Sequence, residues 1–191
     1  MSARENACPS FVFALALSLA LLFAGLTIGF QADIGADGRG DGSTRPTWWD
    51  AFIGVITVNG PAIALLYSGT LTLGLATLIA WPILAIYIGA TLRASVNLLG
   101  PDRVFGAIWV YAPLEFIAMV LSASAGLLPL LSGLMAALSL RSEQQPIRAY
   151  LGSARSTLRI LAVAMCLTVT AASIEATVIA LNPVLDGGSQ Q

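Results

Sequence analysis

Long apolar runs separated by short polar segments organise this sequence. The first run, residues 11–30, is FVFALALSLALLFAGLTIGF, close to the roughly 20 helical residues that cross a bilayer core. It is longer than the apolar region of a signal peptide, and Phe30-Gln31-Ala32 is a poor cleavage site. We therefore predict an uncleaved transmembrane helix at this position.

Two further apolar runs, 51–67 and 71–92, meet at Tyr67-Ser68-Gly69-Thr70. This pattern predicts two membrane helices joined by a tight turn. Asn59-Gly60-Pro61 is expected to bend or break the first helix at membrane depth, and Trp81-Pro82 to kink the second.

Charge decides how the ambiguous stretch 104–140 is interpreted, since it is too long for one straight span and short for two. The segment 141–159 holds four Arg and one Glu, which predicts a basic cytoplasmic loop. The segment 31–50 holds four Asp and two Arg, which suits an extracytoplasmic loop. The N-terminus is then inside, and an even number of spans must precede residue 141.

We therefore predict an all-α fold, a single membrane domain with five spans. Residues 127–140 would form a re-entrant or interfacial extension and no sixth crossing. The expected spans are residues 11–30, 51–67, 71–92, 104–126 and 160–182.

Composition agrees with a polytopic membrane protein, because 57% of the 191 residues are hydrophobic and only 10% are charged. Soluble domains carry about 25% charged residues. All nine basic residues are Arg, and no basic stripe suggests nucleic acid as a partner. Cys8 and Cys166 give neither a disulfide framework nor a metal spacing, and Cys166 is expected to be buried. With no His, we expect no metal site and no cofactor.

Two acidic residues, Glu115 and Glu175, each lie alone within an apolar stretch. A carboxylate at the centre of a membrane helix costs about 2.5–3.5 kcal/mol on insertion scales, so each needs a polar partner, a water path or a proton. Small residues follow each acid or precede it at helical spacing, which predicts that both side chains face helix–helix interfaces. These residues are Ala118, Ser122 and Gly126 beside Glu115, and Ala164, Thr168 and Ala172 beside Glu175. Gly25 and Gly29 give the first helix a similar surface.

Candidate partners for the two acids are few. They are Asn59, Thr57, Thr168, Thr170, Ser173 and Thr177, with Arg93 and Arg103 at span ends. Three hypotheses follow: buried acids that hold the bundle in register, a proton- or substrate-linked site, or contact with a partner subunit. Catalysis has little support, because the chain has no His for a triad and no Gly-x-Ser-x-Gly motif.

Three stretches carry a family resemblance. APLEFIAMVLSASAGLLPL is similar to a family segment written Pro-His-Gly-x-x-Glu, followed by a small-residue helix. AVAMCLTVTAASIEATVIALNP is similar to a final helix with an Ala-Ala-x-Ile-Glu-Ala core, and VNGPAIALLYSGTLTLGLATL to a region that begins with paired Asn. Over roughly residues 50–183, the chain thus resembles the stage II sporulation protein M family of integral membrane proteins.

In this resemblance, Glu115 matches the acid of the first motif and Glu175 the acid of the second. Asn59 matches the first of the paired Asn. The chain departs from the family at three places. This chain has Val110-Tyr111-Ala112 where the family has Pro-His-Gly, and Gly60 where it has the second Asn. The Asn-Gly of the family's third span is also missing, with Ala85-Ile86 near that place. If the family's His works with its Glu, that chemistry is lost here.

The resemblance implies a non-catalytic membrane component, since sporulating relatives act with a peptidoglycan hydrolase and a second membrane-associated partner. We therefore predict a scaffold or anchor in the bacterial cytoplasmic membrane, in contact with lipid, with membrane or envelope proteins or with a second copy. Asn59, Glu115 and Glu175 would form an intramembrane polar cluster. The alternative is a small transporter, permease subunit or immunity-type efflux component using an intramembrane Glu, which broken helices would favour.

Overall fold

The computed structural model describes residues 7–32, 47–138 and 146–181, and within these ranges the chain is all-α. Five of the helices are long and apolar enough to cross a membrane: α1, α2, α3, α5 and α6. The elements are α1 (Ala7–Gln31), α2 (Trp48–Tyr67), the 3-10 turn η1 (Ser68–Thr70), α3 (Leu75–Leu99), α4 (Pro101–Ile108), α5 (Ala112–Leu138) and α6 (Pro146–Leu181). The prediction of an all-α transmembrane bundle is therefore confirmed.

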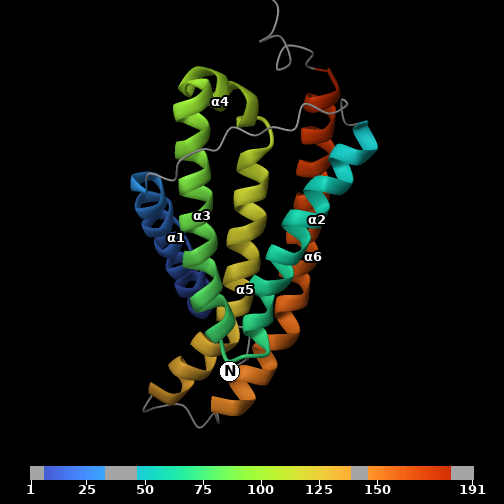
Figure 1. Ribbon diagram of the computed structural model, residues 1–191. Helices are drawn as coiled ribbons and strands as arrows, with labels where there is room; N and C mark the ends of the chain where they lie inside the picture. Colours follow the sequence, from blue (N-terminus) through green and yellow to red (C-terminus); the bar gives the residue numbers. More distant parts are fainter. Residues whose placement is uncertain (1–6, 33–46, 139–145, 182–191) are drawn as a thin grey trace, which may run out of the picture.

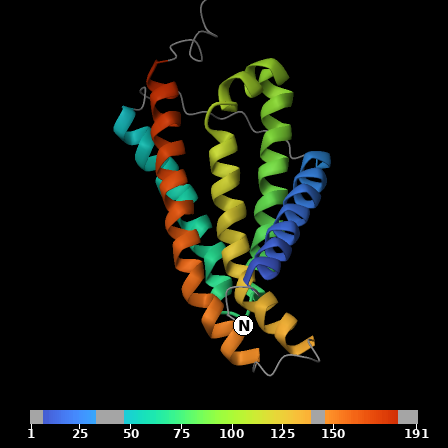
Figure 2. The ribbon, with the colours of Figure 1, turned by 180° about the vertical axis from the view of Figure 1, so that it is seen from behind.

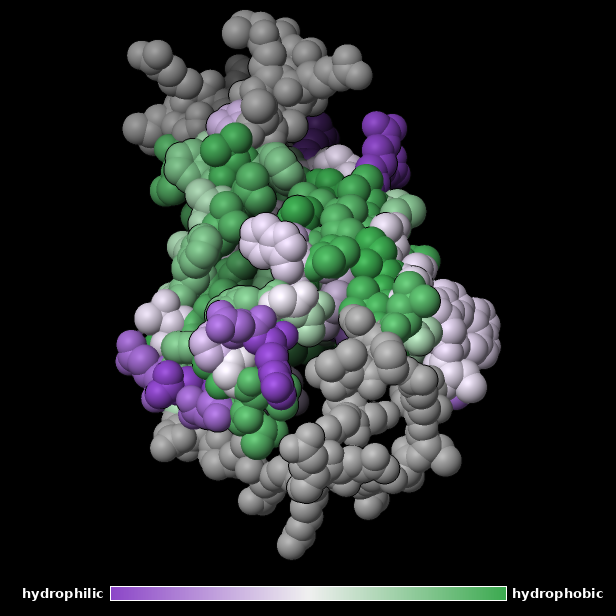
Figure 3. Space-filling view, turned by 90° about the horizontal axis from the view of Figure 1, so that it is seen from above, coloured by the Kyte–Doolittle hydropathy of each residue, from purple (hydrophilic) through white to green (hydrophobic). Residues whose placement is uncertain are grey.

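Helix α5 occupies the middle of the bundle, between an α1–α3 pair and an α2–α6 pair (Figures 1 and 2). Figure 1 also defines two ends: the α4 end, which holds the start of α5 and the end of α6, and the η1 end, which holds the start of α1 and α6. The α4 end, seen in Figure 3, is mostly hydrophobic where it is coloured, with hydrophilic patches towards its edge.

Small residues allow α1 and α3 to approach closely, as the sequence predicts for Gly25 and Gly29. A Cβ atom on Gly29 would lie 2.0 Å from the Ile86 carbonyl oxygen, and one on Gly25 would lie 2.5 Å from Ala85 Cβ. No larger residue fits either position without separating the helices, and such contacts replace a hydrophobic driving force between helices in lipid.

The helix ends follow local capping signals that hydropathy alone does not reveal. The Thr47 hydroxyl accepts the Asp50 N–H while the Asp50 carboxylate accepts the Thr47 N–H, a capping box that starts α2 at Trp48. The tight turn after Tyr67 is present, but α3 begins at Leu75 because Gly74 adopts φ 81°. At its other end, α3 continues to Leu99 and stops at Gly100, with φ 85°.

The three internal prolines do not break their helices. Helix α2 is continuous through Pro61, α3 through Pro82 and α5 through Pro129. Of the two outcomes expected at Asn59-Gly60-Pro61, a bend or a break, the break is therefore excluded, since neighbouring helices in a bundle support a proline within a span. The last turns of α5 lean away from the bundle (Figures 1 and 2).

The predicted boundaries of the last two spans need correction. Residues 127–138 continue α5, so of the two forms predicted for them, a re-entrant segment or an interfacial extension, the re-entrant one is wrong. Residues 104–108 belong to the short helix α4, so the span starts at Ala112. Residues 146–159, predicted as part of a basic loop, are helical: Pro146 is tolerated because it is the first residue of α6, and the helix continues through Gly152. Cys166 is exposed, contrary to the prediction, and the side chain of Cys8 lies outside the described residues.

Candidate functional site

Asn59 and Glu115 meet between α2 and α5. The Asn59 side-chain amide donates a hydrogen bond to Glu115 Oε1 at 2.7 Å, and both side chains are half-buried. This contact joins residues that lie 56 positions apart in sequence. The structure therefore brings together two of the three residues that the sequence analysis singled out.

The interface that holds this pair is built from the small residues predicted to share the Glu115 face. Ala118 and Ser122 are fully buried, and the Ser122 hydroxyl donates to the Ile63 carbonyl of α2 at 2.8 Å. Further along, Gly126 lets the backbones approach so closely that an added Cβ would lie 2.2 Å from the Leu66 carbonyl oxygen. Close backbone contact and polar side chains thus fix the register of α2 on α5.

Glu175 reaches the same region from α6. Its helix packs through Ala164, Thr168 and Ala172, all fully buried as the sequence predicts. The Glu175 carboxylate is half-buried and close enough to Glu115 for the two negative charges to repel each other. Among the described residues Glu175 forms no hydrogen bond.

Tyr111 joins Asn59, Glu115 and Glu175 in this region. In the sequence it stood out only as the residue in place of the family's His. Burial and, to a lesser extent, the negative charges of Glu175 and Glu115 together raise the pKa of Tyr111 to about 12. The phenol therefore remains a neutral hydrogen-bond donor near both acids. Its place, one helical turn before Glu115, is the signal that could have identified it. We call Asn59, Tyr111, Glu115 and Glu175 the polar cluster.

Three members of the polar cluster, Tyr111, Glu115 and Glu175, lie towards the α4 end of the bundle, whereas Asn59 lies near the middle of α2. Glu115 is in the first turn of α5, where the partial positive charge of the helix N-terminus favours an anion. Glu175 precedes the end of α6 by six residues, about 9 Å along the axis. A carboxylate at either position costs less free energy than one at the bilayer centre, because water and headgroups are nearer.

The other candidate partners do not reach the acids. The Thr57, Thr168, Thr170 and Ser173 hydroxyls donate to carbonyls of their own helices, and Thr177 accepts a hydrogen bond from Trp48 Nε1 at 3.1 Å. The Arg93 guanidinium lies over the Phe30 ring, 5.3 Å from its centroid. Within the described ranges, no group of three or more His, Cys, Asp or Glu could hold a metal ion.

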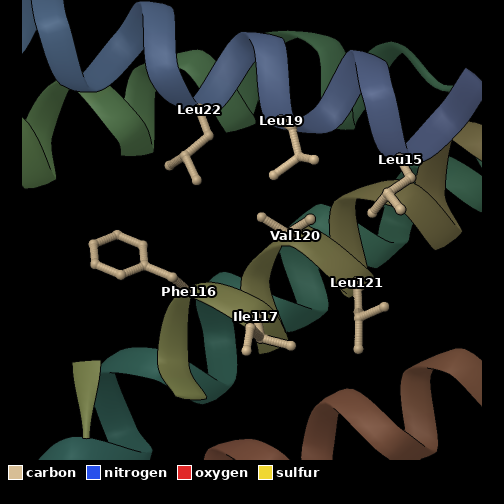
Figure 4. A pocket seen from close by; sticks show the side chains of 7 residues that line it. All are labelled: Leu15, Leu19, Leu22, Phe116, Ile117, Val120 and Leu121. Carbon is tan, nitrogen blue, oxygen red and sulfur yellow. The ribbon is translucent and has the colours of Figure 1, made fainter. Parts of the chain in front are cut away.

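An apolar groove lies apart from the polar cluster, between α1 and α5. It has a volume of about 270 Å³ and is lined only by hydrophobic side chains (Figure 4). These are Leu15, Leu19, Leu22, Phe116, Ile117, Val120 and Leu121. With no polar group to orient a substrate, the groove carries no chemistry of its own.

No protein family, curated protein or solved structure matches this chain. The resemblance to stage II sporulation protein M therefore rests on the quoted motifs and remains a prediction.

Proposed function

We propose that this protein is a non-enzymatic, multi-pass component of the bacterial cytoplasmic membrane that anchors partner proteins through its polar cluster. One observation carries this proposal. Glu115 and Glu175 are half-buried and repel each other, and in the described part of the chain no Arg forms an ion pair with either. A partner that supplies a counter-charge or hydrogen-bond donors would relieve this unfavourable arrangement.

Of the two acids, Glu175 has the greater need for a partner that neutralises its charge or donates a hydrogen bond. Glu115 already accepts the Asn59 amide and lies at a helix N-terminus. Glu175 has no hydrogen bond among the described residues and lies within α6, far from a helix N-terminus that could stabilise its charge. A basic or hydrogen-bond-donating side chain from a neighbouring membrane helix would suit it best.

The orientation of the chain bears on where such a partner would lie. The described charges of α6 at the η1 end are all Arg, which favours the cytoplasmic side for this end and for the N-terminus. The polar cluster would then lie towards the outer leaflet. That location, and the resemblance to stage II sporulation protein M, favour a cell-envelope complex over a cytoplasmic one.

The test compares recovery of partners from native membranes in mild detergent. Glu115→Gln and Glu175→Gln remove one charge each with little change of shape and should lose most of the partners that the wild-type protein recovers. Asp102→Asn, an equal loss of charge at an exposed position of α4, is the matched control and should recover them all. Full recovery with both Gln variants would refute the proposal, as would equal loss with Asp102→Asn.

A second measurement separates anchoring from transport. The same proteins in sealed vesicles should not dissipate an imposed proton gradient. Gradient dissipation by the wild-type protein that disappears in Glu115→Gln would replace the anchoring proposal with a transport function.

A further inference from the structure

The first turns of α6 carry three arginines on one side of the helix. Arg148, Arg155 and Arg159 are spaced by seven and four residues, so their side chains project within about 20° of one direction. All three are exposed, and within the described residues none forms a hydrogen bond or an ion pair. We call these three residues the arginine stripe.

The opposite side of the same turns is held against the bundle, which fixes the direction of the stripe. The Tyr150 hydroxyl donates to the Thr70 carbonyl of η1. Thr157, fully buried, forms a hydrogen bond with the Tyr67 hydroxyl of α2 at 3.0 Å. Tyr150 and Thr157 lie about half a turn away from the arginines, so the stripe must point outwards.

Large apolar side chains lie beside the stripe on the outer surface. Ile147, Leu151 and Leu158 are 72%, 59% and 59% exposed. A helix face that combines exposed arginines with exposed aliphatic residues is typical of a membrane–water interface, where the apolar groups enter the acyl region and the cations reach the headgroups. A soluble acidic partner would leave these apolar side chains in water.

The length of α6 places the stripe at the correct depth. From Arg159 to Leu181 the helix rises about 33 Å, which matches a hydrocarbon core of about 30 Å. Arg159 therefore lies at the hydrocarbon boundary, and Arg155 and Arg148 extend into the headgroup layer and beyond. No acid lies between residues 147 and 174 of α6 to neutralise them.

We propose that the arginine stripe binds the phosphate groups of anionic phospholipids in the leaflet at the η1 end. Charge complementarity provides the attraction, and Ile147, Leu151 and Leu158 make the site specific for a phosphate that is attached to acyl chains. This site is separate from the polar cluster, which lies towards the other end of the bundle.

The test is a lipid titration of the full-length protein in detergent, followed by native mass spectrometry, with phosphatidylglycerol or phosphatidylcholine as the probe. The wild-type protein should bind phosphatidylglycerol at least about tenfold more tightly than phosphatidylcholine. Each Arg→Gln change should reduce this preference by up to about fivefold, and the triple variant R148Q/R155Q/R159Q should abolish it. The preference should also weaken at high salt.

Three controls keep the result interpretable. R148K/R155K/R159K retains the charge and should retain the preference, while R93Q/R103Q, at the α4 end, should leave it unchanged. Circular dichroism checks that each variant keeps its helices. The proposal is overturned if the wild-type protein shows no preference, if the triple Gln variant keeps it, or if soluble glycerol phosphate binds as tightly as the lipid.

Discussion

Gly126→Ala tests the close approach of α5 to α2, on which the geometry of the polar cluster depends. The added Cβ would lie 2.2 Å from the Leu66 carbonyl oxygen and 2.3 Å from Thr77 Oγ1. Ordinary contact begins at 3.4 Å, so the two backbones would have to separate by about 1.2 Å. Thr77 cannot simply rotate away, because its hydroxyl donates to that same Leu66 carbonyl.

The expected cost can be worked from these contacts. Overpacking in a well-packed core costs about 1–3 kcal/mol, and a clash with backbone belongs near the upper end. The better helix propensity of Ala returns up to about 1 kcal/mol. We therefore expect a net loss of about 2 kcal/mol in the free energy of unfolding, measured by circular dichroism during denaturant titration in detergent.

Gly152→Ala is the matched control, since Gly152 is exposed on α6 and an added Cβ would meet nothing within 4 Å. It should be neutral or stabilising by up to about 1 kcal/mol. If Gly126→Ala proves as stable as Gly152→Ala, α2 and α5 do not approach as the structure has them.

Four further predictions follow from the site and the core. A double-mutant cycle of Asn59→Ala and Glu115→Ala should give a coupling of about 0.6–1.7 kcal/mol in unfolding experiments, the range for hydrogen bonds between membrane helices; additive effects would exclude the contact. Glu175→Gln should stabilise the isolated protein at mildly alkaline pH, because it removes a half-buried charge without a hydrogen bond, and a lower stability would contradict this account. Trp81→Phe should lower the free energy of unfolding by about 1–3 kcal/mol, because Trp81 is fully buried and donates to the Ser18 carbonyl at 2.8 Å; an unchanged unfolding curve would be unexpected. Tyr111 should ionise late, with a pKa near 12, so its contribution to stability is present below pH 10 and is lost as the pH rises towards 12; Tyr111→Phe should remove this late step from a phenolate absorbance titration.

Hydropathy and small-residue spacing were enough to predict the architecture. In lipid, an apolar run must form a helix, and small residues decide where helices pack closely. These patterns identified the five helices and the buried faces through Ala118 and Ala172. They did not predict the ends of α2 or α3, which depend on the Thr47–Asp50 capping box and on the positive φ of Gly74. The break that Pro61 could have caused is absent, and the sequence could not show this because the support for a proline comes from neighbouring helices.

The polar cluster, too, was only partly predictable, because a sequence pattern shows which face of a helix is buried but not which residues meet there. The sequence predicted that both acids face interfaces, yet it placed Glu115 near the middle of a span, because an apolar run does not reveal where a helix begins. Helix α5 starts only three residues before Glu115, so this acid has a helix N-terminus and the Asn59 amide to stabilise it. Glu175, near the C-terminal end of α6, has neither advantage within the described chain. An arrangement that stabilises one acid and leaves its neighbour unsatisfied favours an assembly interface over a structural pair, because a purely structural role would be served better by a neutral residue at position 175.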